Sequence, residues 1–396
     1  MFFMTGSGIH GIYPHMYHSW GAASSVSSWY MAVAFEDGVP TSVGVRNQDQ
    51  THCIGSVSES SAAITSEATL QSLDSDGFTL NWTTTDASSR HVGYLALGGD
   101  DIQDVAVGAW TCAGVPGNQS VTGVGFKPTL LFTGGMGSSS FGVAQSNSRA
   151  SFGMSNGLNS GACSCVDING APGNSAPGLC AMFQNPTDCL VVAAQSGNPA
   201  AEATLVSLDS DGFTLNFSSV TSPGLYYFYV ALNGHLSTKV GSFNQPTSTG
   251  NQSQSGLGFK PAVVFFQSYN HVSSGSTVQN IAEFAQGMSD GNSAYVKWAG
   301  ASPGATNTVA KFYTDGGGGG TVLLLADEST SLLKALATLG SFDKDGFTLN
   351  WAQADATARE ILYFALGSSA GTPTLSAGQG SWGGRMETRP SSDFVG

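Results

Sequence analysis

Two pentapeptides have the residue types and spacing of a serine nucleophile. Gly153-Met154-Ser155-Asn156-Gly157 and Gly287-Met288-Ser289-Asp290-Gly291 match the pattern G-x-S-x-G, in which a strained turn between a strand and a helix displays the serine hydroxyl. That motif belongs to a parallel α/β sheet and also needs a histidine and an acid. Here it recurs within strand-like sequence, and its counterpart nearer the N-terminus is Phe35-Glu36-Asp37-Gly38. We therefore interpret both copies as turns between strands.

Paired carboxylates form a second candidate. The pattern Asp-x-Asp-Gly occurs three times, and its acids are Asp74, Asp76, Asp209, Asp211, Asp343 and Asp345. A calcium loop of the EF-hand type needs further oxygen ligands and a closing glutamate, whereas a strand follows each of these pairs. A hairpin turn whose Asp accepts backbone N–H bonds is our interpretation, and a cation site is the alternative. Since no set of acid, base and nucleophile recurs, we expect no enzymatic activity, no metal and no cofactor.

Aromatic and histidine side chains are dense near the N-terminus. His10, His15 and His18 have a spacing that could hold a metal ion. The candidate contact residues are Tyr13, Tyr17, Trp20, Trp29 and Tyr30, together with Trp382 near the C-terminus. Exposed Tyr and Trp on loops commonly anchor sugars or protein partners. Packing against a neighbouring subunit explains the same residues equally well, so both interpretations stay open.

Four of the six cysteines lie close together in the middle of the chain, at Cys163, Cys165, Cys180 and Cys189. The CxC spacing and the lack of a nearby histidine are unlike a structural zinc site. Local disulfides within one long loop are the first interpretation, and free buried thiols are the second. Disulfides would imply a protein that resides outside a reducing cytosol.

The charge balance excludes some classes of partner. The chain has 396 residues, with 13 Lys and Arg against 27 Asp and Glu, so its net charge is −14. Nucleic-acid binding needs clustered cations, and we expect none here. The best apolar stretch, Thr321–Ala326, is far shorter than the roughly 20 residues of a membrane-spanning helix. Residues 1–6 have no basic segment, so we expect no secretory signal; release would then follow cell lysis.

An internal repeat organises these candidates. Residues 72–82 recur as residues 207–217 and again as residues 341–351, at a spacing of about 134 residues, which is the size of a domain. Each copy alternates apolar and polar residues after an Asp-Gly turn, as a half-buried strand requires. The repeat predicts an all-β fold of three tandem β-sandwich domains of jelly-roll type. We expect them at residues 1–100, 101–235 and 236–367, hereafter the first, second and third segments, followed by a tail at 368–396.

The ends of the chain differ from the repeat. The second and third segments open with an aromatic strand, Val107-Gly108-Ala109-Trp110 or Val240-Gly241-Ser242-Phe243, which the first segment lacks. The tail contains Gly380-Ser381-Trp382, which is similar to these openings. We hypothesise that the tail supplies the missing edge strand to the first segment, in the same chain or in a neighbouring copy. The alternative is a shorter first segment with a flexible or docking extension.

The repeated phrase Asp-Gly-Phe-Thr-Leu-Asn-Trp at residues 76–82, the Tyr-Leu-Ala-Leu strand at 94–97 and the Gly-Phe-Lys-Pro segment at 125–128 resemble tandem β-sandwich repeats of virion structural proteins of tailed phages. The resemblance implies a non-enzymatic protein that decorates or projects from a capsid or tail. Its partners would be other virion proteins or copies of itself in a homo-oligomer, and its location the virion surface.

Two other functions fit the same sequence. One is a fibre or adhesin that binds a receptor or a host-surface glycan through the aromatic residues. The other is a self-polymerising extracellular filament whose subunits are joined by strand donation through the tail.

Overall fold

The computed structural model describes residues 1–6, 11–87, 91–175, 179–194, 199–269, 281–316, 320–368 and 375–381. These residues form antiparallel strands in six sheets, and no α-helix occurs among them. The expected all-β class is therefore confirmed. A helix that is long and apolar enough to cross a membrane is likewise not found within these ranges.

The first segment contributes most of a seven-stranded sheet and all of a three-stranded sheet. The larger sheet has the order β13-β5-β4-β3-β1-β9-β31. Its strands are β1 (Phe2–Gly6), β3 (Met16–Ala23), β4 (Ser28–Phe35), β5 (Gly44–Asp49), β9 (His91–Leu97), β13 (Gln145–Ser146) and β31 (Leu375–Ser381). The smaller sheet consists of β6 (Ile54–Val57), β7 (Ile64–Asp74) and β8 (Gly77–Thr84).

The second segment forms a six-stranded and a four-stranded sheet. The larger, β10-β20-β12-β14-β15-β16, contains β10 (Ile102–Thr111), β12 (Leu130–Ser138), β14 (Ser148–Ser155), β15 (Ser160–Asp167), β16 (Cys180–Asn185) and β20 (Tyr226–Gly234). The smaller, β11-β19-β18-β17, contains β11 (Gly117–Thr122), β17 (Leu190–Val192), β18 (Ala201–Asp209) and β19 (Gly212–Val220).

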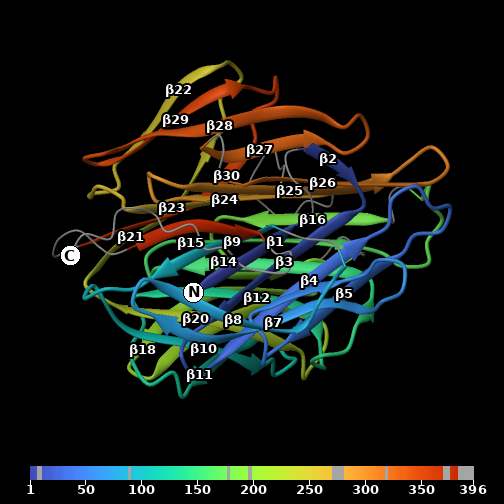
Figure 1. The fold of residues 1–396 in the computed structure, drawn as a ribbon. Helices are drawn as coiled ribbons and strands as arrows, with labels where there is room; N and C mark the ends of the chain where they lie inside the picture. Colours follow the sequence, from blue (N-terminus) through green and yellow to red (C-terminus); the bar gives the residue numbers. More distant parts are fainter. Residues whose placement is uncertain are drawn as a thin grey trace.

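The third segment repeats this strand order. Its larger sheet has the order β2-β26-β25-β24-β23-β30-β21. The edge strand β2 (Gly11–Pro14) belongs to the first segment. The other strands are β21 (Leu236–Asn244), β23 (Val263–Ser268), β24 (Ala282–Ser289), β25 (Ala294–Pro303), β26 (Thr308–Gly316) and β30 (Glu360–Ser368). Its smaller sheet is β22-β29-β28-β27, with β22 (Gly250–Ser255), β27 (Thr321–Asp327), β28 (Leu332–Asp343) and β29 (Gly346–Gln353). Figure 1 shows this smaller sheet at the top of the molecule, and β10, β11 and β18 of the second segment at the bottom.

The Asp-x-Asp-Gly turns are structural. Asp211 accepts backbone N–H bonds from Gly123 at 3.1 Å and Gly125 at 2.7 Å, and Asp345 accepts two equivalent bonds. Asp209 accepts hydroxyl bonds from the side chains on either side of the turn. The predicted hairpin turn, with Asp as a backbone acceptor, is confirmed for the second and third segments.

Each segment has its own apolar cluster between its larger and smaller sheets. The period-two pattern of the repeat supplies it, through Phe78, Leu80 and Trp82 of β8, Phe213, Leu215 and Phe217 of β19, and Phe347, Leu349 and Trp351 of β29. The apolar residues named for β19 and β29 are fully buried, whereas the three named for β8 are partly exposed. Among the described residues, no strand flanks β8 in the position that β11 and β22 occupy beside β19 and β29.

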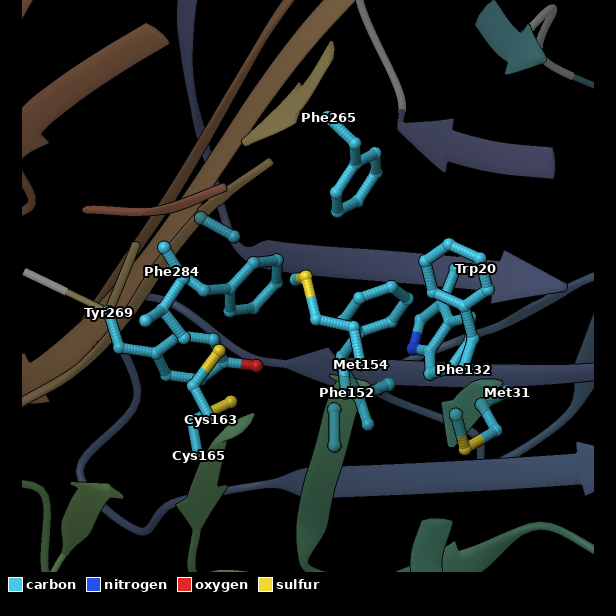
Figure 2. Packing of buried hydrophobic residues seen from close by; sticks show 14 of the residues in the cluster. Trp20, Met31, Phe132, Phe152, Met154, Cys163, Cys165, Phe265, Tyr269 and Phe284 are labelled. Atoms are coloured by element: carbon cyan, nitrogen blue, oxygen red, sulfur yellow. The ribbon is translucent and has the colours of Figure 1, made fainter. Parts of the chain in front are cut away.

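The opposite faces of the three larger sheets meet in one shared core (Figure 2). Phe152 of the second segment lies at its centre, with its ring centroid 4.7 Å from that of Trp20 and 5.2 Å from that of Phe265. Each of these three rings comes from a different segment. Both faces of the larger sheets are therefore buried, one within its own segment and one against the other two segments.

Contacts between segments follow one direction around this core. Strands β4 and β5 of the first segment contact β10, β12 and β14 of the second, and β15 and β16 of the second contact β21 and β24 of the third. Strands β25 and β26 of the third contact β1, β3, β9 and β31. Since β4, β15 and β25 hold the same place in their sheets, the same edge of each segment meets the next segment, and the ring closes with approximate threefold order.

Three corresponding loops meet at one end of this ring. The backbone N–H of Gly38, between β4 and β5, donates to Thr308 O at 2.8 Å. The N–H of Gly173, between β15 and β16, donates to Pro40 O at 2.7 Å, and Gly304, between β25 and β26, donates to Gly173 O at 3.2 Å. Each loop is thus bonded to a loop of another segment.

Each G-x-S-x-G copy covers the end of a strand and the beginning of the turn that follows. The predicted turn between strands is therefore found at Asn156-Gly157 and Asp290-Gly291, while the first glycine of each copy lies within a strand. Gly153 in β14 and Gly287 in β24 leave no room for a Cβ, because carbonyl oxygens of the smaller sheets, those of Cys189 and Val322, occupy that position. In the first segment Gly21 lies in the same way against Cys53 O. The counterpart of the motif therefore begins at Gly21, and our assignment of residues 35–38 was wrong because those residues form a different loop.

The tail strand β31 pairs with β9 of the same chain, at the edge that β10 takes beside β20 and β21 beside β30. The register repeats one detail. A glycine stands opposite the aligned tyrosine in each case, in the pairs Gly108 with Tyr229, Gly241 with Tyr363, and Gly378 with Tyr94. The Gly380-Ser381 motif is thus displaced by two residues from the register that the sequence predicts, and Trp382 lies outside the described residues.

Candidate functional site

Titratable side chains gather where β5 ends and the smaller sheet of the first segment begins. One ligand atom each from Asp49, His52 and Glu67 lies within 4.8 Å of the other two. Asp49 ends β5, His52 precedes β6, and Glu67 lies in β7 beside a register shift in its pairing with β8. The turn after β5 and this irregularity in β7 bring the three together.

Asp49 shapes the turn. Its Oδ1 accepts bonds from the N–H and the hydroxyl of Thr51, both at 2.6 Å, and from the N–H of His52 at 2.9 Å. Burial raises the pKa of Asp49, but the bonds from Thr51 and His52 outweigh this effect and hold the pKa below its usual value. The carboxylate is therefore charged at neutral pH.

His52 lies between two oxygen groups. Its Nδ1 is 3.0 Å from Asp49 Oδ1 and 3.9 Å from Glu67 Oε1, and its Nε2 is 3.0 Å from the Thr83 hydroxyl. The same hydroxyl lies 3.3 Å from the backbone carbonyl of Glu67. With the proton on Nδ1, the imidazole donates to Asp49 Oδ1. With the proton on Nε2, it donates to the Thr83 hydroxyl, which itself donates to the carbonyl, and the Nδ1 lone pair is then free to bind a cation.

The carboxylate of Glu67 accepts a hydrogen bond from a buried tyrosine, Tyr30. Tyr30 donates to Glu67 Oε1 at 2.7 Å, and the amide of Asn47 donates to the Tyr30 oxygen. Burial and the neighbouring carboxylate raise the pKa of Tyr30 far above its usual value. Tyr30 thus remains a neutral donor at any physiological pH.

The second segment carries the same cluster with altered residues. Registers place Asn185 where Asp49 stands, because Ala162 pairs with Asn185 as Tyr30 pairs with Asp49. The thiols of Cys53 and Cys189 both bond to the carbonyl of the corresponding alanine, Ala68 or Ala203. The full set is Asn185, Thr187, Asp188, Glu202 and Ser218 in place of Asp49, Thr51, His52, Glu67 and Thr83.

In the second cluster an amide links two carboxyl groups. Asn185 Nδ2 donates to Asp188 Oδ2 at 2.8 Å and to Glu202 Oε1 at 3.3 Å. Burial and the neighbouring Glu202 raise the pKa of Asp188 to about 8. Asp188 is therefore largely protonated at neutral pH. The third segment has Thr321, Leu336 and Ala352 at the positions of His52, Glu67 and Thr83, so the polar cluster occurs in two segments.

The first cluster can do two kinds of chemistry. One imidazole and two carboxylates form a ligand set that transition metals accept. The order Asp49, His52, Thr83 also has the acid, base and hydroxyl of a hydrolase triad. A triad needs a substrate cleft and donors for an oxyanion as well. A cavity of about 20 Å³ among the described residues lies away from this cluster and is lined by Phe2, Trp20, Phe132 and other residues of the shared core. The geometry therefore favours metal binding over hydrolysis.

The five aromatic residues near the N-terminus that were predicted as contacts lie in strands β2, β3 and β4 rather than in a loop. Trp20, Trp29 and Tyr30 are buried. The interpretation of these three as exposed contact residues is therefore wrong. Tyr13 stacks on Phe312 of the third segment with ring centroids 5.5 Å apart, and Tyr17 meets the same ring edge-on. His18 is buried against Phe284, and His10 lies outside the described residues.

The four central cysteines are free, buried thiols. The first interpretation, local disulfides within one long loop, is therefore wrong, and the second, free buried thiols, is confirmed. Cys163 and Cys165 lie on one strand, β15, and face the shared core with Cys180 of β16 (Figure 2 shows Cys163 and Cys165). Cys189 belongs instead to the cluster between the sheets of the second segment.

The sequence contains a signal that could have revealed the polar clusters. Asp49-Gln50-Thr51-His52-Cys53 and Asn185-Pro186-Thr187-Asp188-Cys189 share their spacing, and each precedes a Glu-Ala-Thr-Leu phrase, at residues 67–70 and 202–205. Aligning the first two segments at these phrases, with a gap of one residue between the pentapeptide and the phrase, superimposes all the polar positions. We found no match for this chain among protein-family models, curated protein sequences or solved structures.

Proposed function

We propose that the chain is a non-enzymatic structural protein of a phage virion, in which three tandem β-sandwich domains of jelly-roll type decorate or project from a capsid or tail. The observation that carries the proposal is the closed ring of contacts among the three segments. A single chain thereby acquires an order that homo-oligomers obtain from separate subunits, and such an order would suit a component of a symmetric particle.

The shared core supports a mechanical role. Trp20, Phe152 and Phe265 join the segments through one continuous apolar cluster. Because interiors are closely packed, a load applied to one segment is transmitted to the others. The low content of charged residues, 10%, suits a surface that contacts neighbouring virion proteins. The partners would be such proteins or further copies of this chain, and release would follow lysis of the host.

The two alternative functions receive less support. A receptor-binding or glycan-binding fibre would use the aromatic residues near the N-terminus, yet Trp20 and Trp29 are buried. A filament joined by strand donation would need the tail strand to be available to another copy, yet β31 pairs with β9 of its own chain.

Purified particles test the proposal. Virions from a lysed culture of the source would be banded by density, probed with antiserum against the full-length chain, and viewed with immunogold. We expect the chain to co-migrate with particles at a fixed ratio to the major capsid protein, with gold on the capsid or tail. Recovery of the chain only in the particle-free fraction would refute the virion role.

A further inference from the structure

We propose that Asp49, His52 and Glu67 bind one divalent transition-metal ion of the Zn²⁺ class at the junction of β5, β6 and β7. The ligands would be the imidazole Nδ1 of His52 and one carboxylate oxygen each from Asp49 and Glu67, with water completing the shell. This site is independent of the virion role proposed above.

The distances suit a small four-coordinate ion. Zinc lies 2.0–2.2 Å from nitrogen and carboxylate oxygen ligands, so two ligands of a tetrahedral site are about 3.4 Å apart. His52 Nδ1 is 3.0 Å from Asp49 Oδ1 and 3.9 Å from Glu67 Oε1. These two separations bracket the tetrahedral value, and rotamer adjustments of a few tenths of an ångström would equalise them.

The cluster sets two carboxyl groups beside a single imidazole. Among the described ion pairs, His52 is the one basic partner of Asp49 and Glu67, and an imidazole carries a positive charge only when both of its nitrogens are protonated. A cation between the carboxylates would supply the positive charge that these groups lack.

Neighbouring groups already orient the ligands. Thr83 bonds to His52 Nε2, which directs Nδ1 towards the carboxylates, and Thr51 and Tyr30 fix Asp49 and Glu67. Metal-binding histidines and carboxylates are held in this way by outer partners. Asp49 and Glu67 are buried while His52 is partly exposed, so an ion can enter past the imidazole.

The second segment supplies a matched control. There Asp188 replaces the imidazole, and the side-chain amide of Asn185 donates hydrogen bonds to the carboxyl groups of Asp188 and Glu202. An amide N–H occupies the place that a cation would need, and Zn²⁺ prefers sites with nitrogen or sulfur ligands. We therefore expect one metal ion for each chain.

Calorimetric titration of the full-length chain with Zn²⁺, and the visible spectrum with Co²⁺, test the proposal. We expect one equivalent to bind, with the absorption bands of four-coordinate Co²⁺ and a rise in thermal midpoint on Zn²⁺ addition. His52→Asn and Glu67→Gln should each weaken binding by at least about tenfold, and Thr83→Val by about 10- to 100-fold.

The controls separate this site from incidental binding. His235→Asn removes an exposed histidine elsewhere and Glu202→Gln alters the second cluster, so both should leave the Zn²⁺ affinity unchanged. Wild-type protein that binds neither ion would overturn the proposal without any variant. Binding that persists in folded His52→Asn protein, or that is lost equally in His235→Asn, would overturn it as well.

Discussion

The ring of Tyr295 lies directly on the backbone of Gly93, so that a Cβ added to Gly93 would be 2.5 Å from Tyr295 Cγ. Tyr295 belongs to β25 of the third segment and Gly93 to β9 of the first. This contact is therefore part of the interface that closes the ring of segments.

The other two interfaces have different pairs at the same place. Trp29 and Phe228 stack between the first and second segments with ring centroids 4.9 Å apart. Gly161 and Leu362 meet between the second and third, where a Cβ added to Gly161 would be 3.3 Å from the leucine side chain. A glycine on one side thus accommodates a larger residue on the other in two of the three interfaces.

Exchanging the sizes at the closing interface tests this relationship. Gly93→Leu should lower the free energy of unfolding by about 1–3 kcal/mol, because the added side chain overlaps Tyr295. The double variant Gly93→Leu, Tyr295→Gly recreates the arrangement of Gly161 and Leu362. We expect a favourable coupling of at least about 0.5 kcal/mol in a double-mutant cycle by urea unfolding. Strictly additive effects would show that the two residues do not pack together.

The tail strand gives a second prediction. A chain ending at Ser368 loses β31 and leaves β9 as an unpaired edge. We expect a lower thermal midpoint, and a synthetic peptide of residues 369–396, added in excess, should restore it by mass action. If β31 pairs with β9 of its own chain, no second copy is needed to complete the sheet. Light scattering on the full chain should then give the mass of one chain. An unchanged midpoint after truncation would contradict a structural role for β31.

The sequence predicted the strands whose burial is one-sided. In β19 the alternation of Phe213, Leu215 and Phe217 with polar residues is visible because one face meets the core and the other meets solvent. In β4 almost every residue is buried, since one face meets the smaller sheet and the other meets the next segment. Such a strand shows no alternation, which is why Trp29 and Tyr30 were interpreted as residues of an aromatic loop.

The polar cluster could not be predicted from periodicity. Asp49 and Glu67 are brought together by an irregular turn and by the register shift beside Ala68, and neither leaves a pattern in the sequence. The repeat is the one guide, since His52 precedes Glu67 by 15 positions and Asp188 precedes Glu202 by 14. The tail strand was anticipated from its glycine, but a displacement by two residues keeps each side chain on the same face, so the sequence does not distinguish the two registers.

Thiol titration gives a third prediction. All six cysteines are free and buried, and burial raises the pKa of Cys53 to about 12 and that of Cys163 far above its usual value. We expect almost no reaction with Ellman's reagent in native protein and six thiols per chain in guanidinium without reductant. Fewer than six in the denatured, unreduced protein would reveal a disulfide.

A buried lysine in the shared core gives a fourth. Lys297 donates from Nζ to the carbonyl of Ser19 at 2.6 Å, and burial lowers its pKa well below the usual value. In the first segment the corresponding residue is Met31, since Met31 pairs with Trp20 as Lys297 pairs with Gln286. Replacing Lys297 with Met therefore follows the repeat.

The lowered pKa of Lys297 fixes the direction in which the free energy of unfolding changes with pH. The unfolded chain holds the Lys297 proton up to about pH 10, whereas the folded chain has lost it once the pH exceeds the lowered value. Wild-type stability from this group should therefore rise with pH across that window. Urea unfolding at pH 6 to 9 should show a smaller slope for Lys297→Met than for wild type. The exposed variant Lys127→Met serves as control, and equal slopes for wild type and Lys297→Met would show that the amine is charged in the fold.

Asp188 should act in the opposite direction. Its pKa is about 8 in the folded chain, because of burial and of Glu202, and about 3.9 in the unfolded chain. Between these values the folded state holds a proton that the unfolded state has released, so stability from this group is complete below about pH 4 and is lost as the pH rises through about 8. Asp188→Asn carries a permanent amide and cannot titrate. We expect the decrease in unfolding free energy from pH 5 to 9 to be smaller in this variant than in wild type, while the exposed control Asp100→Asn retains the wild-type dependence. A variant that keeps the full decrease would mean that Asp188 is ionised beside Glu202, and the second cluster would then hold two negative charges that only a bound cation could neutralise.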